Sequence, residues 1–162
     1  MKTTLSTLCY IESEGSYLML HRNKKENDIN KDKWIGLGGH FEEGESPEEC
    51  MLREIREESG ISLLDYRFRG IVTFVYGEIT EYMHLFTARM DGHEKRLPDC
   101  PEGDLAWVDK KEITSLPIWE GDKIFLRLLA EEAPFFSLKL VYDPEGHLIS
   151  AVLDGKKLSI PE

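Results

Sequence analysis

Three glutamates, Glu54, Glu57 and Glu58, are spaced so that a single helix would carry all of them on one side. Residues three and four positions apart are neighbours on a helix surface, so these carboxylates would lie close together. Their mutual repulsion near the negative end of the helix dipole favours a cation among them. Hard divalent cations prefer oxygen ligands, and Mg²⁺ is commonly shared with substrate phosphates. The spacing therefore indicates a magnesium site, in which Mn²⁺ is a possible substitute.

The residues around the glutamates predict the helix itself. Ser46 is a favourable N-cap, Pro47 suits the first helical position, and Glu49 can complete a capping box with Ser46. Gly60 is placed to end the helix in a left-handed conformation. The predicted helix therefore runs from Pro47 to near Glu58 or the residue after it.

Taken alone, this acidic stretch has a second interpretation, because most glutamate-rich helical segments are simply solvated surfaces. The segment from Gly39 to Ile61, however, resembles the signature of the Nudix hydrolases. That signature is a glycine, five residues, a glutamate, seven residues, Arg-Glu, an aliphatic residue, any residue, Glu-Glu, any residue, a glycine and an aliphatic residue. Every fixed position of the signature is filled in this chain, by Gly39, Glu45, Arg53, Glu54, Ile55, Glu57, Glu58, Gly60 and Ile61.

The resemblance implies a metal-dependent hydrolase that cleaves a diphosphate linkage joined to some other moiety. It implies that the metal is held by the helix glutamates and by a loop carbonyl, that of Gly38. The general base would be Glu54, Glu57 or Glu102, and the residues leave this choice open. Arg53 would orient the carboxylates by ion pairing. The expected metal ligands are Gly38, Glu54, Glu57 and Glu58.

Substrate contacts are expected on both sides of this segment. An arginine fork suits phosphate, and the family commonly has a basic residue where Arg22 stands, whereas composition alone gives a surface arginine equal weight. His40 follows the glycines and is a second candidate phosphate contact, although related enzymes usually have lysine there. Strand alternation places Phe74 and Tyr76 on one side of their strand, as core residues or as a stacking surface for a base.

The whole chain resembles the MutT-type members of the family, which hydrolyse oxidised purine nucleoside triphosphates such as 8-oxo-dGTP. The resemblance implies that Trp119 stacks on the base and that Asp122 binds its edge. Two departures weaken that expectation, since Gly121 stands where an acidic residue is found and Ile35 where an asparagine reads the base. A broader Nudix hydrolase of other nucleoside triphosphates, ADP-ribose or dinucleoside polyphosphates is the alternative. A catalytically silent nucleotide-sensing module is the alternative from another class.

The composition sets limits on partners and location. The chain has 162 residues, 41% of them hydrophobic, which fits one domain over residues 1–162 with the signature at 39–61. A net charge of −11 disfavours bulk nucleic acid and anionic membranes as partners. Three widely spaced cysteines indicate reduced thiols, and no signal peptide or membrane span is evident, so we expect a cytoplasmic protein. Either a monomer or a homodimer is compatible with the sequence.

The pattern of apolar residues and turn residues predicts a mixture of helices and strands, an α+β fold. The Nudix resemblance adds the expected architecture, an α/β/α sandwich with a mixed, largely antiparallel sheet. Strands are predicted at 4–11, 17–21, 71–76, 81–90, 105–109, 136–142 and 147–153, loops at 23–33 and 97–104, a short helix or turn at 110–116, and a second helix from about 119 to 132.

Overall fold

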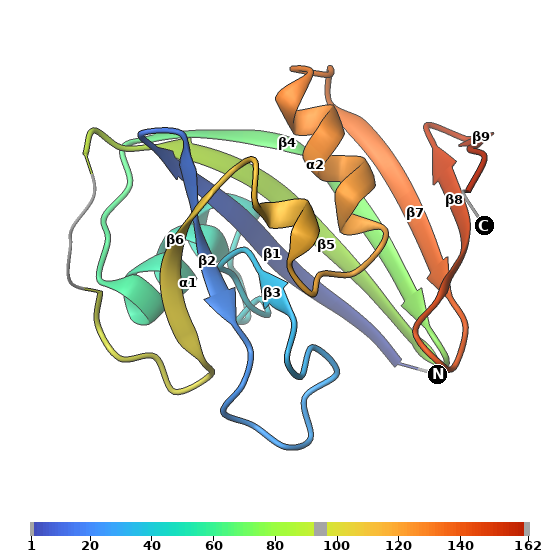
Figure 1. The fold of residues 1–162 in the computed structure, drawn as a ribbon, viewed down its shortest axis with the longest axis horizontal. Coiled ribbons are helices and arrows are strands. Elements are labelled where there is room, and N and C mark those ends of the chain that lie inside the picture. The colour runs from blue at the N-terminus through green and yellow to red at the C-terminus, as the bar shows by residue number, and fades with distance from the viewer. Residues whose placement is uncertain (1, 93–96, 161–162) are drawn as a thin grey trace.

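A twisted mixed sheet with one helix against each face forms the framework of the protein (Figure 1). The computed structural model describes residues 2–92 and 97–160. The sheet has the order β3-β2-β1-β5-β4-β7-β8-β9, and β6 also pairs with β2. Its elements are β1 (Lys2–Ser13), β2 (Ser16–His21), β3 (Trp34–Ile35), α1 (Pro47–Ser59), β4 (Asp65–Tyr76), β5 (Ile79–Arg89), β6 (Asp104–Asp109), the short 3-10 helix η1 (Ile113–Ser115), α2 (Asp122–Ala130), β7 (Phe136–Tyr142), β8 (Leu148–Leu153) and β9 (Lys156–Lys157).

The two helices cover opposite faces of the sheet, because alternate strand residues feed two separate cores. Met51 and Ile55 of α1 are fully buried against one face, together with Cys9 of β1. Phe125 of α2 packs on the other face, with Tyr10 of β1. Among the described strands, β1–β5 and β4–β7 pair in parallel and the remaining pairs are antiparallel. The predicted α/β/α sandwich is confirmed.

The predicted first helix is confirmed in detail. Ser46 accepts a hydrogen bond from the backbone N–H of Glu49, and the Glu49 side chain accepts one from the Ser46 N–H, so the capping box is complete. Gly60 ends the helix with a φ of 75°, and its N–H donates to the carbonyl of Arg56. Local sequence thus determines both ends of α1.

Several predicted boundaries were wrong. The first two strands form only a short hairpin, since most of β1 pairs in parallel with β5 instead. The second helix begins only at Asp122, because Trp119–Gly121 form the preceding turn, and it ends at Ala130. The last hairpin and the strand before η1 lie within one residue of their predicted positions.

β4 is longer than predicted, and it contains a bulge. The strand begins at Asp65, and its register against β5 shifts between Phe68 and Gly70, so that Arg69 is an extra residue. The extra residue reverses the alternation: Val72 faces the α2 core, whereas Phe68 packs in the α1 core. Charged residues and a glycine around the bulge hid this half of the strand from the sequence pattern.

No helix in the described part of the chain combines the length and the apolar character that crossing a membrane requires.

Candidate active site

A cavity of about 640 Å³ opens between α1, the glycine loop before it, the start of β1 and β5, and the turn before α2. Its size is typical of small-molecule sites. It contains most of the residues that the sequence indicated: Arg22, Gly38, His40, Arg53, Glu54, Phe74, Glu102, Trp119 and Asp122. Glu57, Glu58 and Tyr76 are not among its lining residues.

The glycine loop lies directly against α1 because it has no side chains. The Gly38 N–H donates a hydrogen bond of 2.9 Å to Glu58 Oε1. A Cβ at Gly38 would collide with the carbonyl oxygen of Thr7, and a Cβ at Gly39 would lie 2.5 Å from Glu54 Cδ. A larger residue at Gly39 would therefore push the loop away from Glu54, and one at Gly38 would push it away from β1.

Arg53 on α1 donates hydrogen bonds to several carboxylates of the signature segment. Its guanidinium donates to both oxygens of Glu45, at 2.7 and 2.9 Å, and also to Glu54 at 2.8 Å and Glu57 at 3.2 Å. A further hydrogen bond reaches the carbonyl of His40. The guanidinium lowers the pKa of Glu45 to about 2, and hydrogen bonding to Glu45 raises the pKa of Arg53.

Glu58 is turned away from this network. Its residue is 7% exposed, and burial, with a contribution from the Glu102 carboxylate, raises its pKa to about 8. One oxygen accepts from Gly38, whereas Oε2 is buried and has no hydrogen-bond partner among the described residues. A buried carboxylate oxygen without a partner is costly, so its surroundings favour a cation or a protonated donor.

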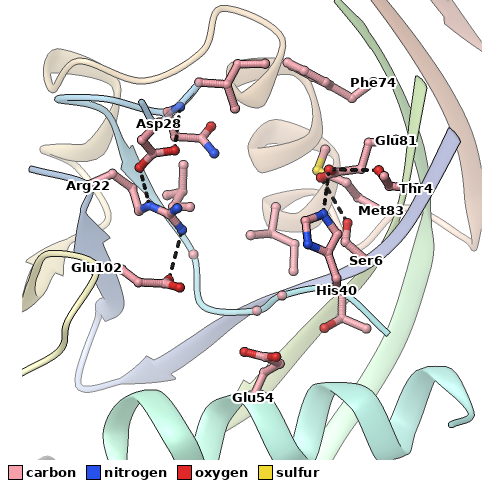
Figure 2. Close-up of a pocket in the computed structure, with 18 of the residues that line it drawn as sticks. Thr4, Ser6, Arg22, Asp28, His40, Glu54, Phe74, Glu81, Met83 and Glu102 are labelled. Carbon is pink, nitrogen blue, oxygen red and sulfur yellow. Dashed lines mark hydrogen bonds and ion pairs between the residues drawn. The ribbon is translucent and has the colours of Figure 1, made fainter. Parts of the chain in front are cut away.

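Arg22 and Glu102 are brought together from positions 80 residues apart in sequence. The arginine donates to Glu102 Oε2 at 3.1 Å and to Asp28 Oδ2 at 2.7 Å, as the left side of Figure 2 shows. Both partners are acidic, so Arg22 is fixed at the cavity wall with part of its guanidinium already engaged. The sequence predicted the arginine and Glu102 separately, and it did not predict that they form an ion pair.

Glu81 was missed by the sequence analysis. It lies on the opposite wall of the cavity in Figure 2, where its carboxylate accepts hydrogen bonds from Thr4 at 3.2 Å and Ser6 at 3.0 Å and lies 3.3 Å from His40 Nε2. Burial opposes its ionisation, but the bonds from His40, Ser6 and Thr4 lower the pKa of Glu81 overall. The same contact raises the pKa of His40. Alternation along β5, which places residue 81 on the side of Met83, was the available signal.

Aromatic rings gather at the far end of the cavity. Trp119 packs edge-on against Phe74, with ring centroids 5.1 Å apart, and against Tyr76 at 5.8 Å. The predicted shared side of Phe74 and Tyr76 is confirmed, since both rings contact Trp119, but only Phe74 lines the cavity. The Trp119 Nε1–H donates to Asn30 Oδ1 at 2.8 Å, and the Lys33 ammonium lies 4.8 Å from the ring centroid.

Asp122 is 4% exposed at the start of α2, and burial raises its pKa to about 8, opposed in part by Lys33. Packing explains why the neighbouring position, Gly121, has no side chain. Its N–H donates to the Tyr142 hydroxyl at 2.7 Å, and a Cβ would lie 2.5 Å from both that oxygen and Leu140 Cδ1. No larger side chain fits at position 121 while Tyr142 occupies this place.

A compact group of potential metal ligands also lies outside the cavity, in the turn between β7 and β8. Ligand atoms of Asp143, Glu145 and His147 lie within 4.8 Å of one another. Asp143 Oδ1 accepts from the backbone N–H groups of the other two residues, and Oδ2 lies 3.2 Å from His147 Nδ1. These bonds are those of an aspartate that stabilises a turn, which accounts for the grouping.

The family model described as "NUDIX domain" matches residues 2–129, which include all of α1 and the whole cavity wall described above. The chain belongs to the Nudix family. As a Nudix hydrolase it acts on pyrophosphate bonds. Enzymes of this family generally use a divalent metal, and Glu58 Oε2, which is buried without a hydrogen-bond partner in the described part of the chain, fits such an ion.

Similar proteins support the same assignment. Over 157 residues the chain is 29% identical to Bacillus subtilis (strain 168) Nudix hydrolase YvcI, covering 94% of this chain and 95% of that protein. It is 28% identical over 131 residues to the oxidized purine nucleoside triphosphate hydrolase of Danio rerio, covering 81% and 82% of the two chains.

Among solved structures, the MutT protein of Bacillus halodurans matches with a TM-score of 0.79 at 27% identity, over 94% of this chain and 99% of that one. The Nudix domain of Shewanella oneidensis NrtR, solved with ADP ribose, matches with a TM-score of 0.69 at 16% identity, over 82% and 89%. The second likeness concerns the fold alone.

Proposed function

We propose that this Nudix hydrolase converts nucleoside triphosphates to the monophosphate and pyrophosphate, with oxidised purines such as 8-oxo-dGTP as preferred substrates. The observation that carries the proposal is that one cavity joins two kinds of surface. Carboxylates and a glycine loop form one end, and Phe74, Trp119 and Asp122 form the other. The first surface suits a triphosphate with its counter-ion, and the second suits a base.

The proposed cofactor is Mg²⁺, with Mn²⁺ as a substitute, held by Glu54, Glu57, Glu58 and the carbonyl of Gly38. When bound, the ion would neutralise phosphate oxygens and lower the pKa of a water. Arg53 holds Glu54 and Glu57 through hydrogen bonds of 2.8 and 3.2 Å.

A carboxylate must take the proton of the attacking water, and Glu54, Glu57 and Glu102 are the candidates. Glu54 and Glu102 line the cavity, while the Glu57 side chain is 60% exposed. Arg22 and His40 lie on the cavity walls between the two ends (Figure 2), where their donors would contact the phosphates. Each is already held by an acidic partner, which fixes its direction before substrate binds.

At the base end, we assign stacking to Phe74 and Trp119 and edge recognition to Asp122. Tyr76 supports the ring of Trp119, and its hydroxyl donates to the carbonyl of Pro144. The Lys33 ammonium over Trp119 would have to move aside for a base to stack on that face. In its protonated form the Asp122 carboxyl can both donate and accept, as a purine edge requires.

Broader specificity is the second candidate, because part of the base end is filled with apolar groups. Ile35 lines the cavity, and Tyr142 and Leu140 leave no room for a side chain at Gly121. Each absent hydrogen bond costs discrimination of about 0.5–1.5 kcal/mol. An enzyme with these features would accept several nucleotides with similar efficiency.

The test is a steady-state panel of kcat/KM over 8-oxo-dGTP, dGTP, 2-hydroxy-dATP, ADP-ribose and dinucleoside polyphosphates, with Mg²⁺ and with EDTA. The proposal expects the oxidised purine nucleotide to lead and EDTA to abolish turnover. Similar values across triphosphates would favour the broader enzyme. Absence of turnover on every substrate would favour a nucleotide-sensing module.

A further inference from the structure

A second concave site, of about 360 Å³, lies at the opposite end of the sheet on the α2 side. It is formed by the last residues of β1 and β5, the first residues of β4 and the C-terminal end of α2. Along β5, Glu81 of the first cavity and Arg89 of the second are eight residues apart, a span of about 26 Å. In a chain of net charge −11, this site collects four cationic side chains, Arg67, Arg69, Arg89 and Lys110, against three carboxylates, Glu12, Asp65 and Glu132.

The bulge in β4 places the two central arginines there. Because the extra residue reverses the alternation of the strand, Arg67 and Arg69 face the α2 side, whereas Phe68 packs against Phe86 in the α1 core. Without the bulge, Phe68 would face α2 and the arginines would face α1. Bulges commonly redirect side chains next to functional sites.

Arg69 is the unusual member of the group. It is 4% exposed, and burial, together with Arg67, lowers its pKa. Its Nη1 donates to Thr87 Oγ1 at 3.2 Å, but Nη2 is buried and makes no hydrogen bond within the described residues. Glu132 Oε2 lies 3.7 Å from Nη2.

The carboxylate of Glu132 is shared unequally between the two arginines. Glu132 Oε2 also accepts a hydrogen bond of 2.8 Å from Arg67. The Glu132 side chain is 58% exposed, and its backbone has a φ of 54°. The other cations of the site already have a close partner, since Arg89 and Lys110 both pair with Glu12. One exposed carboxylate therefore leaves the arginine pair incompletely bonded, whereas a tetrahedral oxyanion could bond to both guanidinium groups.

We propose that Arg67 and Arg69 form a second binding site, for a phosphate-class oxyanion, from which the ligand displaces the Glu132 carboxylate. Free phosphate, pyrophosphate and the phosphate group of a nucleotide share this chemistry. The site is distinct from the cavity beside α1 and does not depend on the function proposed there.

Amide chemical shifts of the ¹⁵N-labelled chain, followed during titration with inorganic phosphate in EDTA, test this site. We expect saturable shifts at Arg69, Thr87 and Glu132 that sodium chloride at equal ionic strength does not reproduce. Parallel titrations with pyrophosphate and a nucleoside monophosphate distinguish the sources by their affinities. Shifts equal to those with chloride, or confined to the glycine loop beside α1, would overturn the proposal.

Three variants separate binding from a purely structural ion pair. Arg67→Gln, at a half-exposed position, should weaken phosphate binding about tenfold or more, whereas Glu132→Gln should tighten it several-fold by removing the competing carboxylate. Arg127→Gln removes the same charge from an exposed position of α2 outside the site and should leave affinity unchanged. Weakening by Glu132→Gln, or no effect of Arg67→Gln, would contradict the assignment.

Discussion

The two ends of the main cavity are built in different ways. Beside α1, the proposed metal ligands come from one continuous stretch, Gly38–Glu58, and ion pairs to Arg53 hold two of them, Glu54 and Glu57. At the base end, the side chains come from distant parts of the chain and are held by aromatic packing around Trp119. The first end is thus specified by local spacing and the second by tertiary contacts.

This difference predicts different responses to substitution. Changes beside α1 should reduce turnover with little effect on base preference, because charge near the phosphates acts on every nucleotide alike. Changes around Trp119 should alter stability and the ranking of substrates. The four predictions below, in order of decreasing effect, test this division.

The largest effect is expected for Glu57→Gln, which removes one negative charge from the proposed metal site. We expect kcat to fall at least ~100-fold, the scale for losing one stabiliser of the transition state. Steady-state kinetics with Mg²⁺ measure it, and Glu43→Gln, an exposed glutamate in the same acidic stretch, is the control. Unchanged turnover would remove Glu57 from the mechanism.

Asp122→Asn should stabilise the protein at alkaline pH. The folded-state pKa of about 8 is higher than that of an unfolded aspartate, so the wild type loses stability as pH rises from about 4 to 8. Asparagine does not ionise, so the variant does not lose stability in this way as the pH rises. Because Asp122 lines an open cavity, we count less than half of the free energy that corresponds to this pKa shift. The free energy of unfolding of the variant should then exceed that of the wild type by about 2 kcal/mol at pH 8 and by much less at pH 5.

Urea unfolding at several pH values measures this gain. A stability difference between variant and wild type that does not grow with pH would show that Asp122 is ionised in the folded protein.

Arg53→Lys should lower kcat about tenfold, since lysine cannot bond Glu45 through two nitrogens while also holding Glu54 and Glu57. The matched control is Arg56→Lys, an exposed arginine on the same helix. The fold and the base preference should be unaffected in both variants. Equal activity of the two would mean that the ion pairs of Arg53 are not required.

The smallest effect is expected for Trp119→Phe, which removes the hydrogen bond to Asn30 and part of the stacking surface. The ratio of kcat/KM for 8-oxo-dGTP to that for dGTP should change about threefold, the scale of one aromatic contact. Trp34→Phe serves as control, because Trp34 stacks on His21 and does not line the cavity. An identical ratio in wild type and Trp119→Phe would exclude Trp119 from base recognition.

The same division explains what the sequence could predict. Capping residues are local, so both ends of α1 could be predicted from residues 46–60 alone. The parallel pairing of β1 with β5, the bulge at Arg69 and the hydrogen bonds of Glu81 to β1 depend on contacts between distant segments. The contact of Tyr142 with Gly121 also joins distant segments. From the sequence, Gly121 was only a departure from the MutT-type pattern, whereas the structure shows that Tyr142 leaves no room for a side chain there.

The central claim is that the α1 carboxylates hold the dication that binds the triphosphate. A crystal grown with Mn²⁺ and a non-hydrolysable nucleoside triphosphate analogue tests it directly through anomalous scattering. The account predicts a manganese peak at about 2.0–2.2 Å from oxygens of the Glu54, Glu57 and Glu58 group and of the analogue's phosphates. A peak held instead by Asp143, Glu145 and His147, with the α1 carboxylates still bound to Arg53, would contradict it.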